Sequence, residues 1–290
     1  MPLASDQPLI LAFTADFFLI PKLEDTARAL GFRLEVVQRT ADLGAEGAPI
    51  PRAVPLTEPL EGPDAAFVRS LVERRPALLL VDTTHDAVPW EHWIQTLKTG
   101  SATRRIPVVA FGPHVEAETL ERAIQAGAEE AVSLGKLQAS LAEIIQRRAR
   151  RIDLAALKEA CGQPLSELGA HGLELLNSGE YFEAHEVLEK AWMEAPEWHG
   201  YLYRSLLQVS VAYLQVQRAN YAGAVKMLLR LKQWLEPLPD RCSGIDIAGL
   251  KRNMAEFSAA VDAAGADGMA SLDPELLRQI PIINGGRLRS

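Results

Sequence analysis

The stretch Gly179–Trp192 reads Gly-Glu-Tyr-Phe-Glu-Ala-His-Glu-Val-Leu-Glu-Lys-Ala-Trp, and it predicts a helix that carries one histidine among several glutamates. When the residues are projected at about 100° each, the apolar side chains gather on one face. That face contains Tyr181, Ala184, Leu188, Ala191 and Trp192. The stretch therefore predicts that the second half of the chain packs as helices around an apolar core.

The same helix carries the strongest candidates for chemistry. His185 lies at the border of the apolar face, Glu189 follows one turn later, and Glu186 is within reach of both. They could bind a divalent metal or act as general acid and base. The alternative is a histidine paired with a carboxylate for packing, and we favour it because buried polar groups are normally paired. A metalloprotease helix would need a second histidine where Glu189 stands.

Further helices are expected on both sides of this stretch, at Pro164–Asn177, Trp198–Arg218, Tyr221–Leu235 and Ile247–Ala264. The helix Trp198–Arg218 is apolar over most of its circumference, so it is expected to lie at the centre of a helical bundle. Its polar stripe includes Arg204 and Gln208. If this stripe faces the His185 helix, one internal polar network forms, with the members Tyr181, His185, Glu189, Arg204 and Gln208.

Four separated blocks in this half resemble the domain of unknown function 309 family. After Gly179–Trp192 come Gln208 within Leu-Leu-Gln-Val-Ser-Val-Ala-Tyr, then Asn220–Ala224, then Gly244-Ile245-Asp246. The resemblance implies an all-helical domain in which one helix is surrounded by the others, with no assigned activity. Two glycines expected from the family pattern are replaced, by Leu206 and by Ala219.

The first half alternates apolar runs with amphipathic stretches, which is typical of a parallel sheet covered by helices. Strands are expected at Leu9–Thr14, Arg33–Val37, Ala77–Val81, Pro107–Phe111 and Glu130–Ser133. Helices are expected at Pro21–Leu30, Asp64–Arg74, Trp90–Lys98, Glu116–Ala126 and Gln138–Arg150, with a long Pro-rich loop at Thr40–Pro63. The pattern predicts the flavodoxin-like strand order 2-1-3-4-5. The expected domains are 1–150 and 164–290, joined by a linker at 151–163.

Residues 8–148 resemble a response-regulator receiver domain. Leu79-Leu80-Val81-Asp82 places Asp82 where a receiver carries its phospho-acceptor, and Ile106–Phe111 and Ala126-Gly127-Ala128 match later segments. The residues that support phosphorylation differ, however. Thr14 and Ala15 replace the acidic pair that holds Mg²⁺, Gly112 replaces a hydroxyl residue, and the expected lysine falls near Leu134, two residues before Lys136. We therefore interpret this half as a degenerate receiver in which Asp82 is either a vestigial acceptor or a helix-capping acid.

The composition narrows the functional classes. The chain has 290 residues, a formal net charge of −8 and 48% hydrophobic residues, which is ordinary for a globular protein and unfavourable for nucleic-acid binding. No apolar run approaches membrane-spanning length. Only two cysteines occur, Cys161 and Cys242, and they are too few and too far apart for a disulfide framework or a Cys-x-x-Cys site. This fits a reducing compartment and predicts a cytoplasmic location.

These observations favour a regulatory or interaction protein. Its receiver-like domain is not phosphorylated, its helical domain has no assigned activity, and a protein partner or a homodimer is expected. The alternative is a metal-dependent hydrolase that uses the cluster His185, Glu186 and Glu189. No cofactor other than a divalent metal is indicated.

Overall fold

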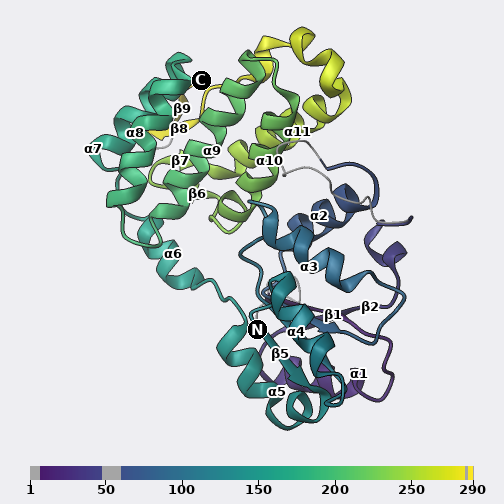
Figure 1. Cartoon of the computed structure of the whole chain (residues 1–290). Coiled ribbons are helices and arrows are strands. Elements are labelled where there is room, and N and C mark those ends of the chain that lie inside the picture. Colours follow the sequence, from purple (N-terminus) through teal and green to yellow (C-terminus); the bar gives the residue numbers. More distant parts are fainter. Residues whose placement is uncertain (1–6, 48–59, 285–286, 290) are drawn as a thin grey trace. The chain divides into compact units, whose positions relative to one another are not determined.

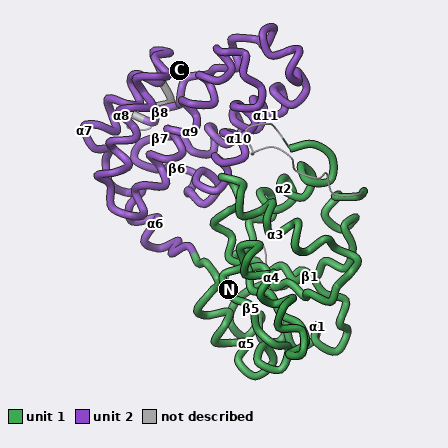
Figure 2. The backbone as a smooth tube through the Cα atoms, viewed as in Figure 1, with its two compact units in different colours: residues 1–151 green, residues 152–290 purple. Residues whose placement is uncertain are grey.

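The computed structural model describes residues 7–47, 60–284 and 287–289. The chain forms two compact units, Met1–Arg151 and Ile152–Ser290 (Figures 1 and 2). Within the described residues, no helix combines the length and the apolar character needed to cross a membrane.

Unit 1 contains a five-stranded parallel sheet, with β1 (Leu9–Phe13), β2 (Arg33–Val37), β3 (Leu78–Asp82), β4 (Val108–Gly112) and β5 (Glu130–Ser133). The strand order is β2-β1-β3-β4-β5, which confirms the predicted flavodoxin-like topology. Every residue of β1, β3 and β4 is buried. These continuous apolar runs are typical of parallel strands that helices cover on both faces.

Five helices surround this sheet: α1 (Ile20–Ala29), α2 (Gly62–Arg74), α3 (Trp90–Thr99), α4 (Ala117–Ala126) and α5 (Leu134–Arg148). On one face, α1 and α5 cover a core that includes Ala12, Leu23 and Ile144. On the other, Phe67 of α2 stacks on Trp93 of α3 at 4.4 Å between ring centroids. Phe13 packs edge-on against Trp93, so the end of β1 is sealed by aromatic rings.

Most strand and helix ends of unit 1 lie within two residues of the sequence expectation, and two segments differ by more. The helix expected from Gln138 begins at Leu134, because the Ser133 side chain accepts a hydrogen bond from the backbone N–H of Lys136 and caps it early. The expected loop Thr40–Pro63 begins with a 3₁₀ turn, η1 (Thr40–Leu43). Its central part, residues 48–59, lies outside the described residues.

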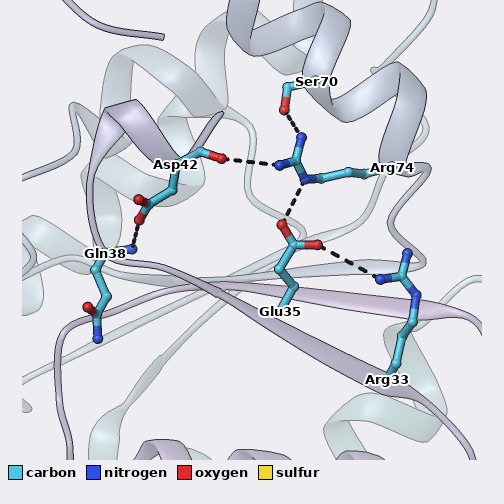
Figure 3. A network of polar contacts seen from close by, with 6 residues as sticks. All are labelled: Arg33, Glu35, Gln38, Asp42, Ser70 and Arg74. Atoms are coloured by element: carbon cyan, nitrogen blue, oxygen red, sulfur yellow. Dashed lines mark hydrogen bonds and ion pairs between the residues drawn. The ribbon is translucent and has the colours of Figure 1, made fainter. Parts of the chain in front are cut away.

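A polar network ties the outer strand β2 to α2 and η1 (Figure 3). The Nε of Arg74 donates to Glu35 Oε1 at 2.8 Å, and the same guanidinium contacts Ser70 and the carbonyl oxygen of Asp42. The Asp42 carboxylate accepts hydrogen bonds from the backbone N–H groups of Gln38 and Arg39, which lower its pKa. Arg74 thereby fixes the connection that follows the edge strand.

Unit 2 is mainly helical, with α6 (Leu154–Cys161), α7 (Glu167–Ser178), α8 (Tyr181–Glu194), α9 (Gly200–Gln217), α10 (Tyr221–Leu235) and α11 (Ile247–Gly268). Two 3₁₀ turns follow, η2 (Met269–Ser271) and η3 (Pro274–Leu276). Helix α9 packs against both α8 and α10 and buries most of its residues, which confirms the predicted central helix.

Glycines allow α7 to approach this centre closely. A Cβ added to Gly169 would stand 2.3 Å from the Tyr203 ring, and one added to Gly172 would stand 2.6 Å from Leu188 Cγ. Ala219, where the sequence resemblance leads us to expect glycine, adopts a left-handed φ of 51° between α9 and α10. The alanine therefore takes a backbone conformation that glycine adopts without steric cost.

The expectation that the two cysteines are too far apart for a disulfide was wrong, because Cys161 and Cys242 form one. They are 81 residues apart in the sequence, yet the end of α6 lies against the strand β6 (Arg241–Cys242), and Ser243 N donates to Cys161 O at 2.8 Å. Sequence distance does not limit which cysteines meet in a folded chain. The cytoplasmic location loses the support it drew from the cysteines.

Two further elements of unit 2 were not foreseen. The expected linker 151–163 contains α6, whose Leu157 and Cys161 are buried in the helical core. A small antiparallel sheet also forms in the order β6-β7-β8-β9, with β7 at Ile245–Asp246, β8 at Ile282–Asn284 and β9 at Arg287–Arg289. The chain therefore returns from its last helix to pair with the segment before α11.

Candidate functional site

Asp82, which the sequence resemblance predicts to be a vestigial phospho-acceptor, is enclosed by the fold. It is the last residue of β3, the middle strand of the sheet, and only 7% of its surface is exposed. Its neighbours across the sheet are Phe111 of β4 and the end of β1. Functional groups of parallel α/β sheets gather at this carboxyl edge, where the strands end.

Both oxygens of the Asp82 carboxylate accept internal hydrogen bonds. The Thr14 hydroxyl donates to Oδ2 at 2.9 Å. Thr84 donates twice to Oδ1, from its backbone N–H at 3.0 Å and from its hydroxyl at 2.7 Å. Asp82 therefore closes the turn after β3 and ties it to the end of β1.

Asp16, the acid next to Thr14 and Ala15 in the sequence, accepts hydrogen bonds from the backbone. Asp16 Oδ1 accepts hydrogen bonds from Phe18 N at 2.9 Å and from Leu19 N at 3.2 Å, and so caps the turn before α1. The backbone N–H of Asp16 donates to the Thr14 hydroxyl at 3.2 Å. A hard divalent cation prefers several carboxylate oxygens, and here both nearby carboxylates have structural partners.

Of the two other positions that the sequence resemblance singled out, packing restricts the residue at Gly112. A Cβ added to Gly112 would stand 2.2 Å from the hydroxyl oxygen of Thr83, which itself donates to Phe111 O at 3.3 Å. A larger residue at 112 would displace this buried threonine. Lys136 is exposed in the first turn of α5, two residues after Leu134.

The histidines of this unit do not converge. His85 is buried, and its Nε2 has no hydrogen-bond partner among the described residues. His92 Nε2 lies 2.8 Å from Asp64 Oδ1, and His114 is exposed after β4. Throughout the described ranges, no group of three or more His, Cys, Asp or Glu side chains is placed to hold a metal ion.

In the helical unit, α8 places the predicted cluster at the surface. His185 is half-buried, whereas Glu186 and Glu189 are exposed. In the part of the chain that the structure describes, neither a hydrogen bond nor an ion pair joins His185 to these glutamates. The hydrolase alternative therefore has no three-ligand site here, although His185 and Glu189 stay on adjacent turns of one helix.

The remaining members of the predicted polar network have separate environments. Arg204 lies between two indole rings, at 4.4 Å from the Trp192 centroid and 4.2 Å from that of Trp234. Tyr181 packs edge-on against Tyr213, and burial raises the pKa of its hydroxyl. Gln208 is buried, and its Oε1 accepts no hydrogen bond from a described residue.

The arginine between two tryptophans is the main feature that the sequence did not reveal. Trp192 comes from α8, Arg204 from α9 and Trp234 from α10, so the arrangement joins three helices. A desolvated cation between aromatic faces contributes about 2 kcal/mol or more. The sequence placed Trp192 and Arg204 on separate helices but gave no indication that they come into contact.

Part of the helical unit is similar to a known protein family. Residues 170–227 match the model of the Domain of unknown function (DUF309). The match runs from α7 through α8 and α9 into α10 and includes His185, Arg204 and Gln208. It confirms the resemblance derived from the sequence. No curated protein matches the chain.

Solved structures similar to the chain include several receiver domains. One belongs to a sensor histidine kinase of Pseudomonas aeruginosa PAO1, with 19% identity, a TM-score of 0.37, and coverage of 49% of this chain and 97% of that one. A DNA-binding response regulator of Colwellia psychrerythraea shows 14% identity, a TM-score of 0.35, and coverage of 48% and 98%. A cyanobacterial phytochrome response regulator shows 12% identity, a TM-score of 0.36, and coverage of 49% of this chain and 94% of that one. The fold of unit 1 itself rests on its strand order.

Proposed function

We propose that the chain is a regulatory or interaction protein whose receiver-like unit is not phosphorylated and is joined to a helical unit containing the DUF309 segment. The observation that supports this proposal is the internal bonding of Asp82. Its two carboxylate oxygens accept from Thr14 and Thr84, so the acceptor position serves to hold two turns together.

Phosphorylation of a carboxylate has further requirements that these residues do not meet. Mg²⁺ must offset the negative charge of the phosphoryl donor, and it needs oxygen ligands. At the two positions that would supply them stand Thr14, whose hydroxyl is directed at Asp82, and Ala15. The unit then contributes to regulation by binding a protein partner. A homodimer and a cytoplasmic location are further parts of the proposal.

The test is a titration of the full chain with Mg²⁺ and beryllium fluoride, which mimics an aspartyl phosphate. Trp90 and Trp93 begin α3 directly after the Asp82 turn, so their fluorescence would report a rearrangement there. We expect an unchanged spectrum in wild type and in Asp82→Asn. A saturable change that disappears in Asp82→Asn would contradict the proposal.

The candidate metal ligands His185 and Glu189 have a separate test. Protein purified without chelators is analysed for bound metal beside His185→Ala, with circular dichroism to verify folding. Stoichiometric metal that is lost only in the variant would restore the hydrolase alternative. We expect equal, substoichiometric metal in both.

A further inference from the structure

Two adjacent aromatic rings are exposed at the carboxyl edge of the sheet in unit 1. Phe17 and Phe18, in the turn between β1 and α1, have 73% and 96% of their surface exposed. Val115, in the turn after β4, is 76% exposed. Large apolar side chains that are clustered and exposed mark interaction sites in soluble proteins, and aromatic residues are enriched among those that contribute most to binding.

The turn that carries the two rings is fixed by hydrogen bonds. Asp16 Oδ1 accepts from Phe18 N and Leu19 N, and Asp16 N donates to the Thr14 hydroxyl. That hydroxyl donates to the buried Asp82, so the Asp82 carboxylate helps to hold the start of the turn in place. Leu19, which follows the rings, is 1% exposed and anchors the chain in the core.

This rigidity has an energetic consequence for binding. The backbone of the turn is already ordered, and each phenylalanine has only two side-chain torsions to restrict. A partner that covers the rings therefore removes apolar area from water at a small cost in conformational entropy. Phe18, almost completely exposed, gains most from such burial.

Charges around the rings indicate the chemistry of the partner. The turns after β1, β3 and β4, at residues 14–19, 83–89 and 113–116, end at the same edge of the parallel sheet. These three turns contain the acids Asp16, Asp86 and Glu116 and no lysine or arginine. The turn after β2, at the same edge, adds Asp42, Glu46 and the base Arg39, which lies 3.7 Å from the Asp42 carboxylate, and Lys22 stands in the first turn of α1. Acids therefore outnumber bases around the rings. A second copy of this chain would bring the same acidic turns, and an anionic lipid surface would be repelled as well.

We propose that the Phe17–Phe18 turn is a docking surface for a partner protein that offers an apolar pocket or segment flanked by lysine or arginine. The rings enter the apolar part of the partner, and its basic residues face the acidic turns. The proposal rests on the interaction role proposed above and specifies which surface carries it. It does not depend on whether His185 and Glu189 of α8 bind a metal.

The test uses peptides displayed on phage as the probe. A random peptide library is selected on the immobilised full chain, with the double variant Phe17→Ala/Phe18→Ala as the counter-selection. We expect enriched peptides that combine apolar residues with Lys or Arg. A synthetic version should bind the double variant at least about ten-fold more weakly than wild type. Phe182→Ala, at a 47% exposed phenylalanine of α8, is the matched control and should bind as wild type.

Several outcomes would overturn the proposal. These are the absence of enriched peptides, enrichment of acidic peptides, and equal binding by the double variant. Sedimentation showing a wild-type dimer that the double variant lacks would identify a second copy as the occupant. Flotation with phosphatidylcholine vesicles that depends on the two phenylalanines would identify a membrane instead. A phosphorylated Asp82 together with Phe-dependent peptide binding would refute the proposed function and leave this surface standing.

Discussion

The hydrogen bond from Thr14 to Asp82 gives a quantitative test of the enclosed acceptor. In Thr14→Val the side chain keeps its shape but loses the hydroxyl, which donates to Asp82 Oδ2 at 2.9 Å and also accepts a longer hydrogen bond from Asp16 N at 3.2 Å. Both residues are buried, and Oδ2 would have no other donor among the described residues. A buried hydrogen bond to a carboxylate contributes about 1.5–3 kcal/mol, so unfolding of unit 1 should become easier by that amount.

This loss corresponds to a decrease of about 3–12 °C in the Tm for a domain of this size. Urea and thermal unfolding of the full chain, followed by tryptophan fluorescence and circular dichroism, measure it. Thr83→Val is the matched control. It removes a buried hydroxyl that donates to the neutral carbonyl of Phe111 at 3.3 Å, which predicts a cost of only about 0.5–1.5 kcal/mol.

A double-mutant cycle separates the bond from other effects of the substitution. With Thr14→Val and Asp82→Ala, the two changes should be non-additive by about 0.5–3 kcal/mol, because each removes the same interaction. A Thr14→Val variant as stable as Thr83→Val, or additive changes in the cycle, would refute the view that Asp82 is held by Thr14.

Four other predictions concern the helical unit. Ala219→Gly should raise the free energy of unfolding by about 0.4–1 kcal/mol in urea, because glycine relieves the left-handed φ of 51°. Gly172→Ala should lower it by up to about 2 kcal/mol, since overpacking against α8 costs more than the gain in helix propensity. Reduction of Cys161–Cys242 by dithiothreitol should cost about 2–5 kcal/mol in the same assay. Burial lowers the pKa of His199 below 6.5, so its contribution to stability is present above pH 6.5 and is lost as the pH falls. His199→Asn should therefore show a weaker loss of Tm between about pH 7 and 5 than wild type.

Two of these predictions have a matched control variant in the chain. Gly135→Ala, on α5 with open space around its Cβ, should not destabilise. A Cys161→Ser/Cys242→Ser variant should be insensitive to dithiothreitol. Equal stability of Gly172→Ala and wild type, a destabilised Ala219→Gly, or a dithiothreitol effect that persists in the double serine variant would contradict the corresponding prediction. So would an unchanged pH dependence in His199→Asn.

The parts of the fold that the sequence predicted have strong periodic signals. The strands β1, β3 and β4 are uninterrupted apolar runs, and the 3.6-residue period of Gly179–Trp192 placed Tyr181 and Leu188 in the core as observed. The helix α6 gave little signal because only two of its eight residues are buried. The strands β6 to β9 have two or three residues each and depend on pairing between distant segments.

For the candidate site, too, the sequence predicted what depends on a single helix and missed what depends on packing between helices. The helical projection placed His185 at the border of the buried face, where it is half-buried, because this position follows from one helix alone. It could not place Arg204 between Trp192 and Trp234, since that requires the packing of three helices. The replaced receiver residues were visible in the sequence, but the bonds from Thr14 and Thr84 to Asp82 were not.

The central claim, that Asp82 is a structural acceptor of hydrogen bonds and not a phospho-acceptor, is tested most directly by the intact mass of the full chain. The protein is incubated with acetyl phosphate and Mg²⁺ and analysed by mass spectrometry beside Asp82→Asn. We predict identical, unmodified masses for each protein before and after incubation. A wild-type species heavier by one phosphoryl group, absent from Asp82→Asn, would contradict the claim.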